Sequence, residues 1–147
     1  MKKGCSACRS LFWRGLDLKD KKGRRYYKNK NFKHSLKHAW NGLKTAVRAE
    51  RNMRTHILFT GLVILAGSFF QLRQIEWLWL LSAVFLVLIC ELVNTAIETI
   101  VDLVVGDKLH PLARDAKDIG AAVVIMASLF AVIIGIVIFG PKLWNTF

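Results

Sequence analysis

The chain has 147 residues, is 54% hydrophobic and carries a formal net charge of +12, so its length fits a single domain. Of its 22 Lys and Arg residues, only Arg73, Lys108, Arg114, Lys117 and Lys142 follow residue 56. No groove-reading motif accompanies the basic residues, so we expect no nucleic acid and an anionic membrane surface as their partner.

The basic part of the chain divides in two. The charge pattern of residues 1–31 predicts a basic cytosolic tail. Cys5 and Cys8 lie in this tail, but the second Cys or His pair that a zinc site needs is missing. From about residue 32 to 54, apolar side chains recur mostly at three- and four-residue spacing between basic ones, a pattern that predicts an amphipathic helix lying in the membrane interface. The apolar positions of this helix include Phe32, Leu36, Trp40, Leu43 and Val47.

Three apolar segments follow, from about residue 57 to 72, 77 to 105 and 118 to 139, separated by polar connections at 73–76 and 106–117. The first is short for a hydrocarbon core of about 30 Å, but it gains length if the preceding helix continues into it. We therefore predict an all-α membrane protein with an N-terminal interfacial helix and three transmembrane helices. The concentration of Lys and Arg before residue 57 and within 106–117 predicts that both regions face the cytosol.

The second apolar segment contains four polar residues, Glu91, Asn94, Glu98 and Asp102. Their offsets along a helix bring them within about 80° of one another, so they form one polar stripe that rises from the bilayer towards the cytosol. Ionisable groups inside a span by default mark a functional site. Hydrogen bonding between helices of an oligomer is the structural alternative, but three acids and an Asn exceed what packing needs.

Further residues could complete a site at the cytosolic end. Glu50 and Glu98 could together hold Mg²⁺, which prefers a few carboxylates plus substrate phosphates. The adjacent Lys117 and Asp118 offer a cation for a phosphate and an acceptor for hydroxyl groups. Because the chain has neither a Walker motif nor a G-x-G-x-x-G loop, a proton- or cation-coupled transport subunit fits these residues as well as an enzyme does.

The segment 91–98, ELVNTAIE, resembles the signature of the prokaryotic diacylglycerol kinase family, which includes the undecaprenol kinases of Gram-positive bacteria. Segments 110–122 (HPLARDAKDIGAA) and 50–56 (ERNMRTH) resemble two further motifs of that family. The resemblance implies a homotrimer with three transmembrane helices per chain, in the bacterial plasma membrane. It also implies composite active sites at the cytosolic interface, which use ATP and magnesium to phosphorylate a lipid alcohol.

The resemblance also implies roles for individual residues. Glu91 would be the general base, and the family pattern assigns magnesium to Glu50 and Glu98. Glu91 and Arg54 are the predicted lipid contacts, and Asn31 stands where the better-known diacylglycerol kinases have a basic residue. We expect undecaprenol as the substrate, with diacylglycerol as the alternative. The predicted nucleotide-binding residues are Glu50, Asn94, Glu98, Lys108, His110, Lys117 and Asp118.

Overall fold

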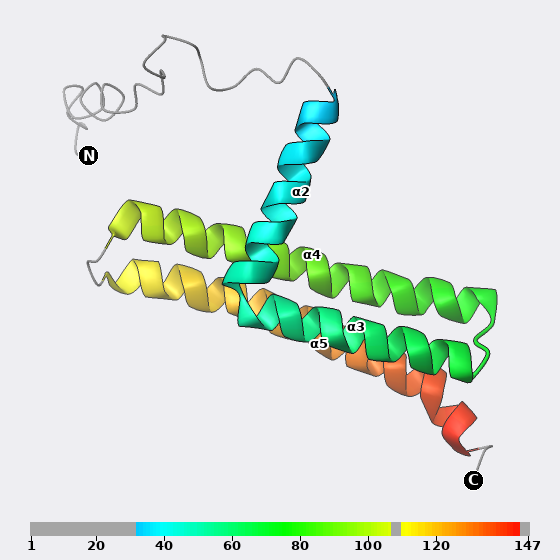
Figure 1. Ribbon diagram of the computed structural model, residues 1–147. Coiled ribbons are helices and arrows are strands. Elements are labelled where there is room, and N and C mark those ends of the chain that lie inside the picture. Colours follow the sequence, from blue (N-terminus) through cyan, green and yellow to red (C-terminus); the bar gives the residue numbers. More distant parts are fainter. Residues whose placement is uncertain (1–31, 107–109, 145–147) are drawn as a thin grey trace, which may run out of the picture. The chain divides into compact units, whose positions relative to one another are not determined.

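The computed structural model describes residues 32–106 and 110–144. Within these ranges the chain is helical and contains no strand, which confirms the all-α prediction (Figure 1). The predicted tail with Cys5 and Cys8, and also Asn31 and Lys108, lie outside the described residues. The helices are α2 (Phe32–Ala49), α3 (Arg51–Phe69), α4 (Gln74–Val105) and α5 (Pro111–Trp144).

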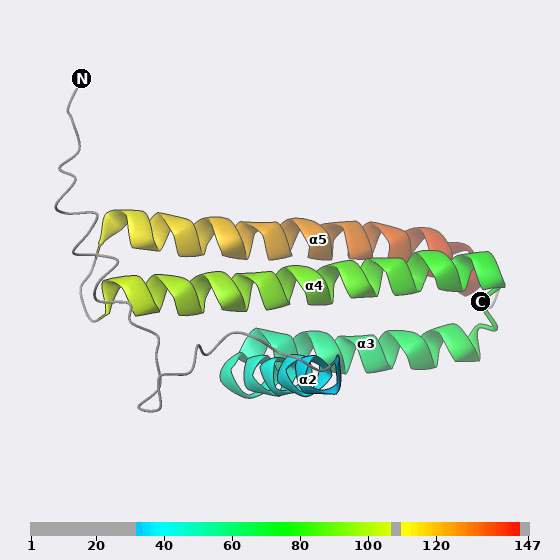
Figure 2. The same ribbon diagram turned by 90° about the horizontal axis from the view of Figure 1, so that it is seen from above.

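The chain divides into two units, Met1–Ala39 and Trp40–Phe147. The described part of the first unit is the start of α2, where Phe32 and Leu36 are exposed. The second unit contains the rest of α2 and the three long helices. In it α4 and α5 run side by side in opposite directions, and α3 packs along α4 (Figures 1 and 2).

A small apolar core joins the end of α3, the start of α4 and the end of α5. Leu72, Leu80 and Ile138 are buried in it, and partly buried apolar side chains surround them. Gly67 is needed here, because a Cβ at this position would stand 2.8 Å from Cη2 of Trp77. The core therefore forms where the backbone of α3 closely approaches the first turn of α4.

Among the described helices, α4 and α5 are long and apolar enough to cross a membrane. Only 28% of the apolar window of α4 and 17% of that of α5 is buried within the chain. Most of their apolar side chains therefore face outwards, where lipid or another protein surface must cover them. α3 does not reach the same apolar content, because Arg51, Arg54 and His56 occupy its first two turns.

The structure corrects two predicted boundaries, the end of the amphipathic helix and the start of the second apolar helix. The amphipathic helix ends at Ala49 rather than near residue 54, because Glu50 adopts an extended backbone and begins the next helix as its N-cap. Residues 74–76, expected in a polar turn, form the first turn of α4. The chain reverses just before them, at Gln71, which has a positive φ of 49°.

The last helix is longer at both ends than predicted. It begins at Pro111 rather than near residue 118, and proline is favoured in the first turn because the missing N–H has no partner there in any case. It also continues past the predicted stop, through Pro141 to Trp144. Gly106, with φ of 58°, ends α4 in a backbone conformation that glycine adopts without strain.

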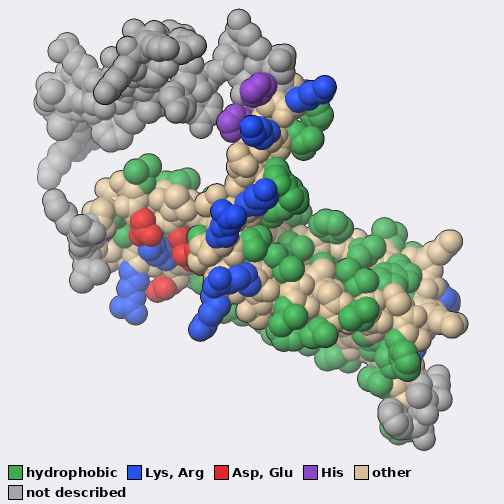
Figure 3. Space-filling view, viewed as in Figure 1, with side chains coloured by type: hydrophobic (Ala, Val, Ile, Leu, Met, Phe, Trp, Pro, Cys, Tyr) green, Lys and Arg blue, Asp and Glu red, His purple; other side chains and the backbone are tan. Residues whose placement is uncertain are grey.

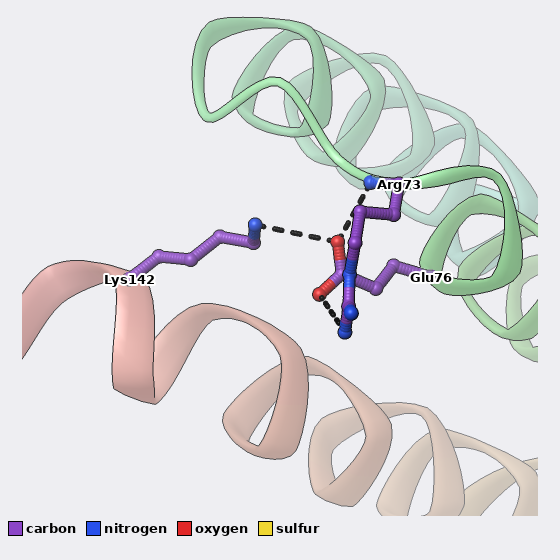
Figure 4. Close-up of polar contacts among 3 residues, drawn as sticks. All are labelled: Arg73, Glu76 and Lys142. Atoms are coloured by element: carbon purple, nitrogen blue, oxygen red, sulfur yellow. Dashed lines mark hydrogen bonds and ion pairs between the residues drawn. The ribbon is translucent and has the colours of Figure 1, made fainter.

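An ionic cluster ties the start of α4 to the end of α5 (Figure 4). The backbone N–H of Arg73 donates to Oε2 of Glu76 over 2.7 Å, which satisfies one of the unpaired donors at the helix N-terminus. The Arg73 guanidinium and the Lys142 ammonium both lie 3.3 Å from the Glu76 carboxylate. Glu76 therefore serves both as a helix cap and as a link between two helices.

Two substitutions should separate these contributions to stability. We expect Glu76→Ala to lower the midpoint of thermal unfolding in detergent more than Glu76→Gln. The reason is that Gln still accepts the capping hydrogen bond, although it loses the charge attraction to Arg73 and Lys142. Equal midpoints for the two variants would show that the cap contributes nothing and that only the ion pairs matter.

Candidate functional site

The polar stripe of α4 is graded in burial within the chain. Glu91 is 1% exposed and Asn94 is 5% exposed, whereas Glu98 is half-buried and Asp102 is exposed. These residues recur at three- and four-residue spacing, so one face of the helix carries them all. The deepest member of the stripe is thus a carboxylic acid enclosed by the helix packing.

Glu91 is unusual because its carboxyl group has no partner in the described part of the chain. Neither oxygen accepts or donates a hydrogen bond to any described residue. A buried polar group left without a hydrogen bond costs about 1–3 kcal/mol, so folds rarely keep one without a functional reason. This carboxyl group therefore requires a hydrogen-bond partner from outside the described residues, such as water, a ligand or another chain.

A cavity of about 390 Å³ borders Glu91. Its polar side is formed by α3 and α4, and its other wall is the mostly apolar face of α5 between Ala121 and Val132. A space of this kind suits a molecule with a polar head and an apolar body. The polar lining residues from α3 and α4 are Asn52, His56, Glu91, Asn94 and Glu98.

Asn94 and Glu98 are joined directly. Nδ2 of Asn94 donates to Oε1 of Glu98 over 2.8 Å. Because a carboxylate only accepts hydrogen bonds, this contact orients one oxygen of Glu98 and leaves the other available. The Glu98 carboxylate is thus oriented within the lining of the cavity.

Charged side chains gather where α4 ends and α5 begins (Figure 3). Nζ of Lys117 lies 2.6 Å from Oδ1 of Asp102, and Nε of Arg114 lies 3.6 Å from Oδ2 of Asp118. All four side chains remain at least one third exposed, so these pairs contribute little to stability. They form a polar end on the α4–α5 pair, opposite the Glu76 cluster.

Glu50 lies at the start of α3 and is half-buried. As the N-cap of α3 it makes no side-chain capping hydrogen bond, so its carboxylate is not used to satisfy the helix. It is close enough to interact electrostatically with both Glu91 and Lys117, as is Glu98. The break between α2 and α3 therefore adds a fourth carboxylate to the three of the stripe.

The sequence matches the family description "Prokaryotic diacylglycerol kinase" over residues 37–139. The chain belongs to this family. It is therefore a lipid kinase, and the kinase hypothesis is preferred to the transport hypothesis. A kinase of this family uses ATP as the phosphate donor.

The names of three similar proteins specify two different substrates. A diacylglycerol kinase of Synechocystis is 45% identical over 102 residues, which cover 69% of this chain and 58% of the relative. The undecaprenol kinase of Bacillus subtilis is 40% identical over 124 residues, covering 84% of this chain and 99% of the relative. The diacylglycerol kinase of Escherichia coli K12 is 34% identical over 110 residues, covering 75% and 86%.

In this lipid kinase the structure brings part of the predicted site together. Glu91, Asn94 and Glu98 line one cavity, with Glu50 and Lys117 nearby. The other predicted residues that the structure describes lie outside the cavity lining. Asp118 pairs with Arg114, Arg54 is exposed, and the exposed His110 accepts a hydrogen bond at Nδ1 from the Leu112 N–H over 3.2 Å.

Asn52 and His56 were not among the predicted site residues, yet both line the cavity. Their four-residue spacing on α3, within the same short motif as Glu50, is the signal that could have identified them. Lys117 was one of the cations expected to be available to the stripe, but the sequence did not specify that it pairs with Asp102. That pair joins two helices and depends on their relative register.

Proposed function

We propose that the chain transfers the γ-phosphate of ATP to the hydroxyl of undecaprenol, giving undecaprenyl phosphate. The observation that carries this proposal is the Glu91 carboxyl group, which is buried, has no partner among the described residues and borders a cavity with an apolar wall. A lipid alcohol entering from the bilayer would place its hydroxyl at Glu91 and its chain along α5.

In the proposed reaction Glu91 is the general base. It takes the proton from the lipid hydroxyl, the alcohol oxygen forms a bond to the γ-phosphorus, and the bond from that phosphorus to the bridging oxygen of ADP breaks. Phosphoryl transfer mainly requires positioning and neutralisation of charge, and a base must lie within hydrogen-bonding reach of the proton. The depth of Glu91 suits a hydroxyl that arrives from the membrane side.

Glu50 and Glu98 fit a magnesium ion bound together with the phosphates of ATP. The described residues contain no group of three or more His, Cys, Asp or Glu side chains that could hold a metal by themselves. Mg²⁺ usually binds through one or two carboxylates, water and substrate phosphates, which is what these two acids would provide. When bound, the ion would neutralise the charge that develops on the transferring phosphoryl group.

The remaining predicted residues would bind the nucleotide. Asn94 would hold Glu98 in place, and the Lys117 ammonium would contact phosphate after leaving Asp102. Asp118, Lys108 and His110 would lie around the nucleotide, and Arg54 would contact the lipid head. The exposed and weakly paired charges at the start of α5 support this, because a nucleotide could displace such pairs at little cost.

Lys117→Met should test the nucleotide role. We expect the KM for ATP to rise by about tenfold or more, because a hydrogen bond to a charged phosphate is lost. Asp102→Asn is the matched control, since it breaks the same ion pair but keeps the ammonium, and the KM should change by less than about threefold. Equal effects of the two variants would mean that Lys117 acts through Asp102 and not on ATP.

The proposed membrane arrangement adds α3 as a third transmembrane helix, a homotrimer, and a cytosolic active site in the bacterial plasma membrane. The distribution of Lys and Arg supports the orientation, because these residues concentrate before residue 57 and within 106–117, and such clusters favour the cytosolic side of a membrane. The exposed apolar faces of α4 and α5 support assembly with other chains or lipid. Crosslinking in native membranes, followed by mass determination, would test the trimer.

Undecaprenol is preferred as the substrate because the match to the Bacillus subtilis undecaprenol kinase spans nearly that whole protein. Diacylglycerol is the second candidate, because the Synechocystis diacylglycerol kinase has the higher identity over its shorter match. The test is phosphate transfer from labelled ATP by purified protein in mixed micelles, with both lipids offered in parallel. Faster labelling of diacylglycerol than of undecaprenol would overturn the proposed substrate. If neither lipid were labelled in the presence of magnesium, both candidate substrates would be wrong.

A further inference from the structure

Gly120 of α5 lies directly against Asn94 of α4. A Cβ at position 120 would collide with Oδ1 of Asn94 and would also stand 3.8 Å from Cδ1 of Ile97. By contrast, a Cβ at Gly135, on the same helix, would have nothing within 4 Å. Gly120 is therefore the place on α5 where any side chain would displace the Asn94 amide.

The orientation of the Asn94 amide explains why this contact matters. Nδ2 must face the Glu98 carboxylate, because the opposite orientation would set the amide oxygen against a carboxylate oxygen. Oδ1 then points to α5, where it is buried and has no hydrogen-bond partner in the described part of the chain. It occupies the space beside Gly120 that a Cβ would fill.

We propose that Gly120 is a positioning residue for the kinase reaction, which acts through Asn94 to fix the Glu98 carboxylate. With only hydrogen on its Cα, Gly120 leaves room for Oδ1 while Nδ2 stays on Glu98. A methyl group at this position would force the Asn94 amide to rotate, which breaks its 2.8 Å hydrogen bond to Glu98. This inference rests on the proposed role of Glu98 in binding magnesium with ATP.

The test compares Gly120→Ala with Gly135→Ala. We expect Gly120→Ala to raise the Mn²⁺ concentration for half-saturation about tenfold in the presence of a non-hydrolysable ATP analogue, measured by electron paramagnetic resonance. The KM for the lipid should change by less than about twofold, and Gly135→Ala should behave like the unchanged protein. The proposal would be overturned if the Mn²⁺ concentration for half-saturation were the same in Gly120→Ala as in Gly135→Ala.

Two further variants keep the test decisive. In a protein that already carries Asn94→Ala, adding Gly120→Ala should not change the Mn²⁺ concentration for half-saturation further. The reason is that Gly120 is proposed to act only through the Asn94 side chain, which is then absent. Independent, additive losses from the two substitutions would overturn the proposal. If Gly120→Ala does not fold, Asn94→Leu leaves Gly120 unchanged and removes the donor to Glu98 without adding a charge. It should show the same weakened metal binding, and unchanged binding would contradict the proposal.

The metal-binding readout is independent of the lipid that the enzyme uses. If neither undecaprenol nor diacylglycerol were phosphorylated, the proposed function would fail, while the difference between Gly120→Ala and Gly135→Ala could still be measured. Conversely, normal lipid phosphorylation with equal metal binding in both variants would remove only the role of Gly120.

Discussion

Replacing Glu91 by Gln is expected to lower kcat for lipid phosphorylation by about 10²–10⁴-fold, the usual contribution of a general base. Gln has nearly the same shape and keeps the buried site filled, but it cannot take a proton from the lipid hydroxyl. Magnesium-dependent binding of ATP should remain close to normal, because the nucleotide is assigned to residues nearer the cytosolic end. Single-turnover transfer from labelled ATP measures the chemical step directly.

The matched control for this experiment is Glu76→Gln, which makes the same chemical change in the first turn of α4, whereas Glu91 lies near the middle of that helix. Glu76 borders neither the cavity nor the charged end of the α4–α5 pair, so its variant should keep its turnover. Near-normal turnover in Glu91→Gln would show that the assigned base is wrong. The buried carboxyl group would then have a structural role in the assembled protein.

The second large effect is expected for Glu98→Gln. This variant should raise the magnesium concentration for half-maximal activity by about tenfold or more and weaken ATP binding, because one of the two proposed metal ligands loses its charge. Isothermal titration with an ATP analogue, with and without magnesium, would measure the loss. Binding without magnesium should change much less than binding with it.

The two substitutions on α4 therefore have distinct signatures. Glu91→Gln should lower the rate of phosphate transfer and leave ATP binding close to normal. Glu98→Gln should instead weaken the magnesium-dependent binding of ATP. If Glu98→Gln kept its normal magnesium dependence, the metal would have to be assigned elsewhere. The role inferred for Gly120 would then fall as well, because that residue is argued to act through Asn94 on Glu98.

The stripe on α4 could be predicted because its cause is local. A helix places every third or fourth residue on one face, so the positions of Glu91, Asn94 and Glu98 in the sequence are enough to align them. The ends of the helices were harder to predict, because the local sequence signals that end a helix are weak. At Glu50, for example, the helix breaks without a Gly or Pro to mark the place.

The cavity could not be predicted, because it is made by the register of three helices against one another. Asn52 and His56 reach it from α3, and the wall of α5 reaches it from a segment about 70 residues further along the chain. Nothing in the periodicity of either helix specifies how far one slides along the other. Side-chain packing decides this only once the helices are in contact.

By itself, the sequence determined the helical class and the polar face of α4, because these depend on local spacing and composition. The kind of reaction followed only from the resemblance of its motifs to a known family. Only the tertiary structure decided that Glu91 is buried without a hydrogen-bond partner among the described residues, that Lys117 pairs with Asp102, and that Gly120 lies against Asn94. Each of these depends on contact between helices that are distant in sequence, and such contacts are set by close packing rather than by any local pattern.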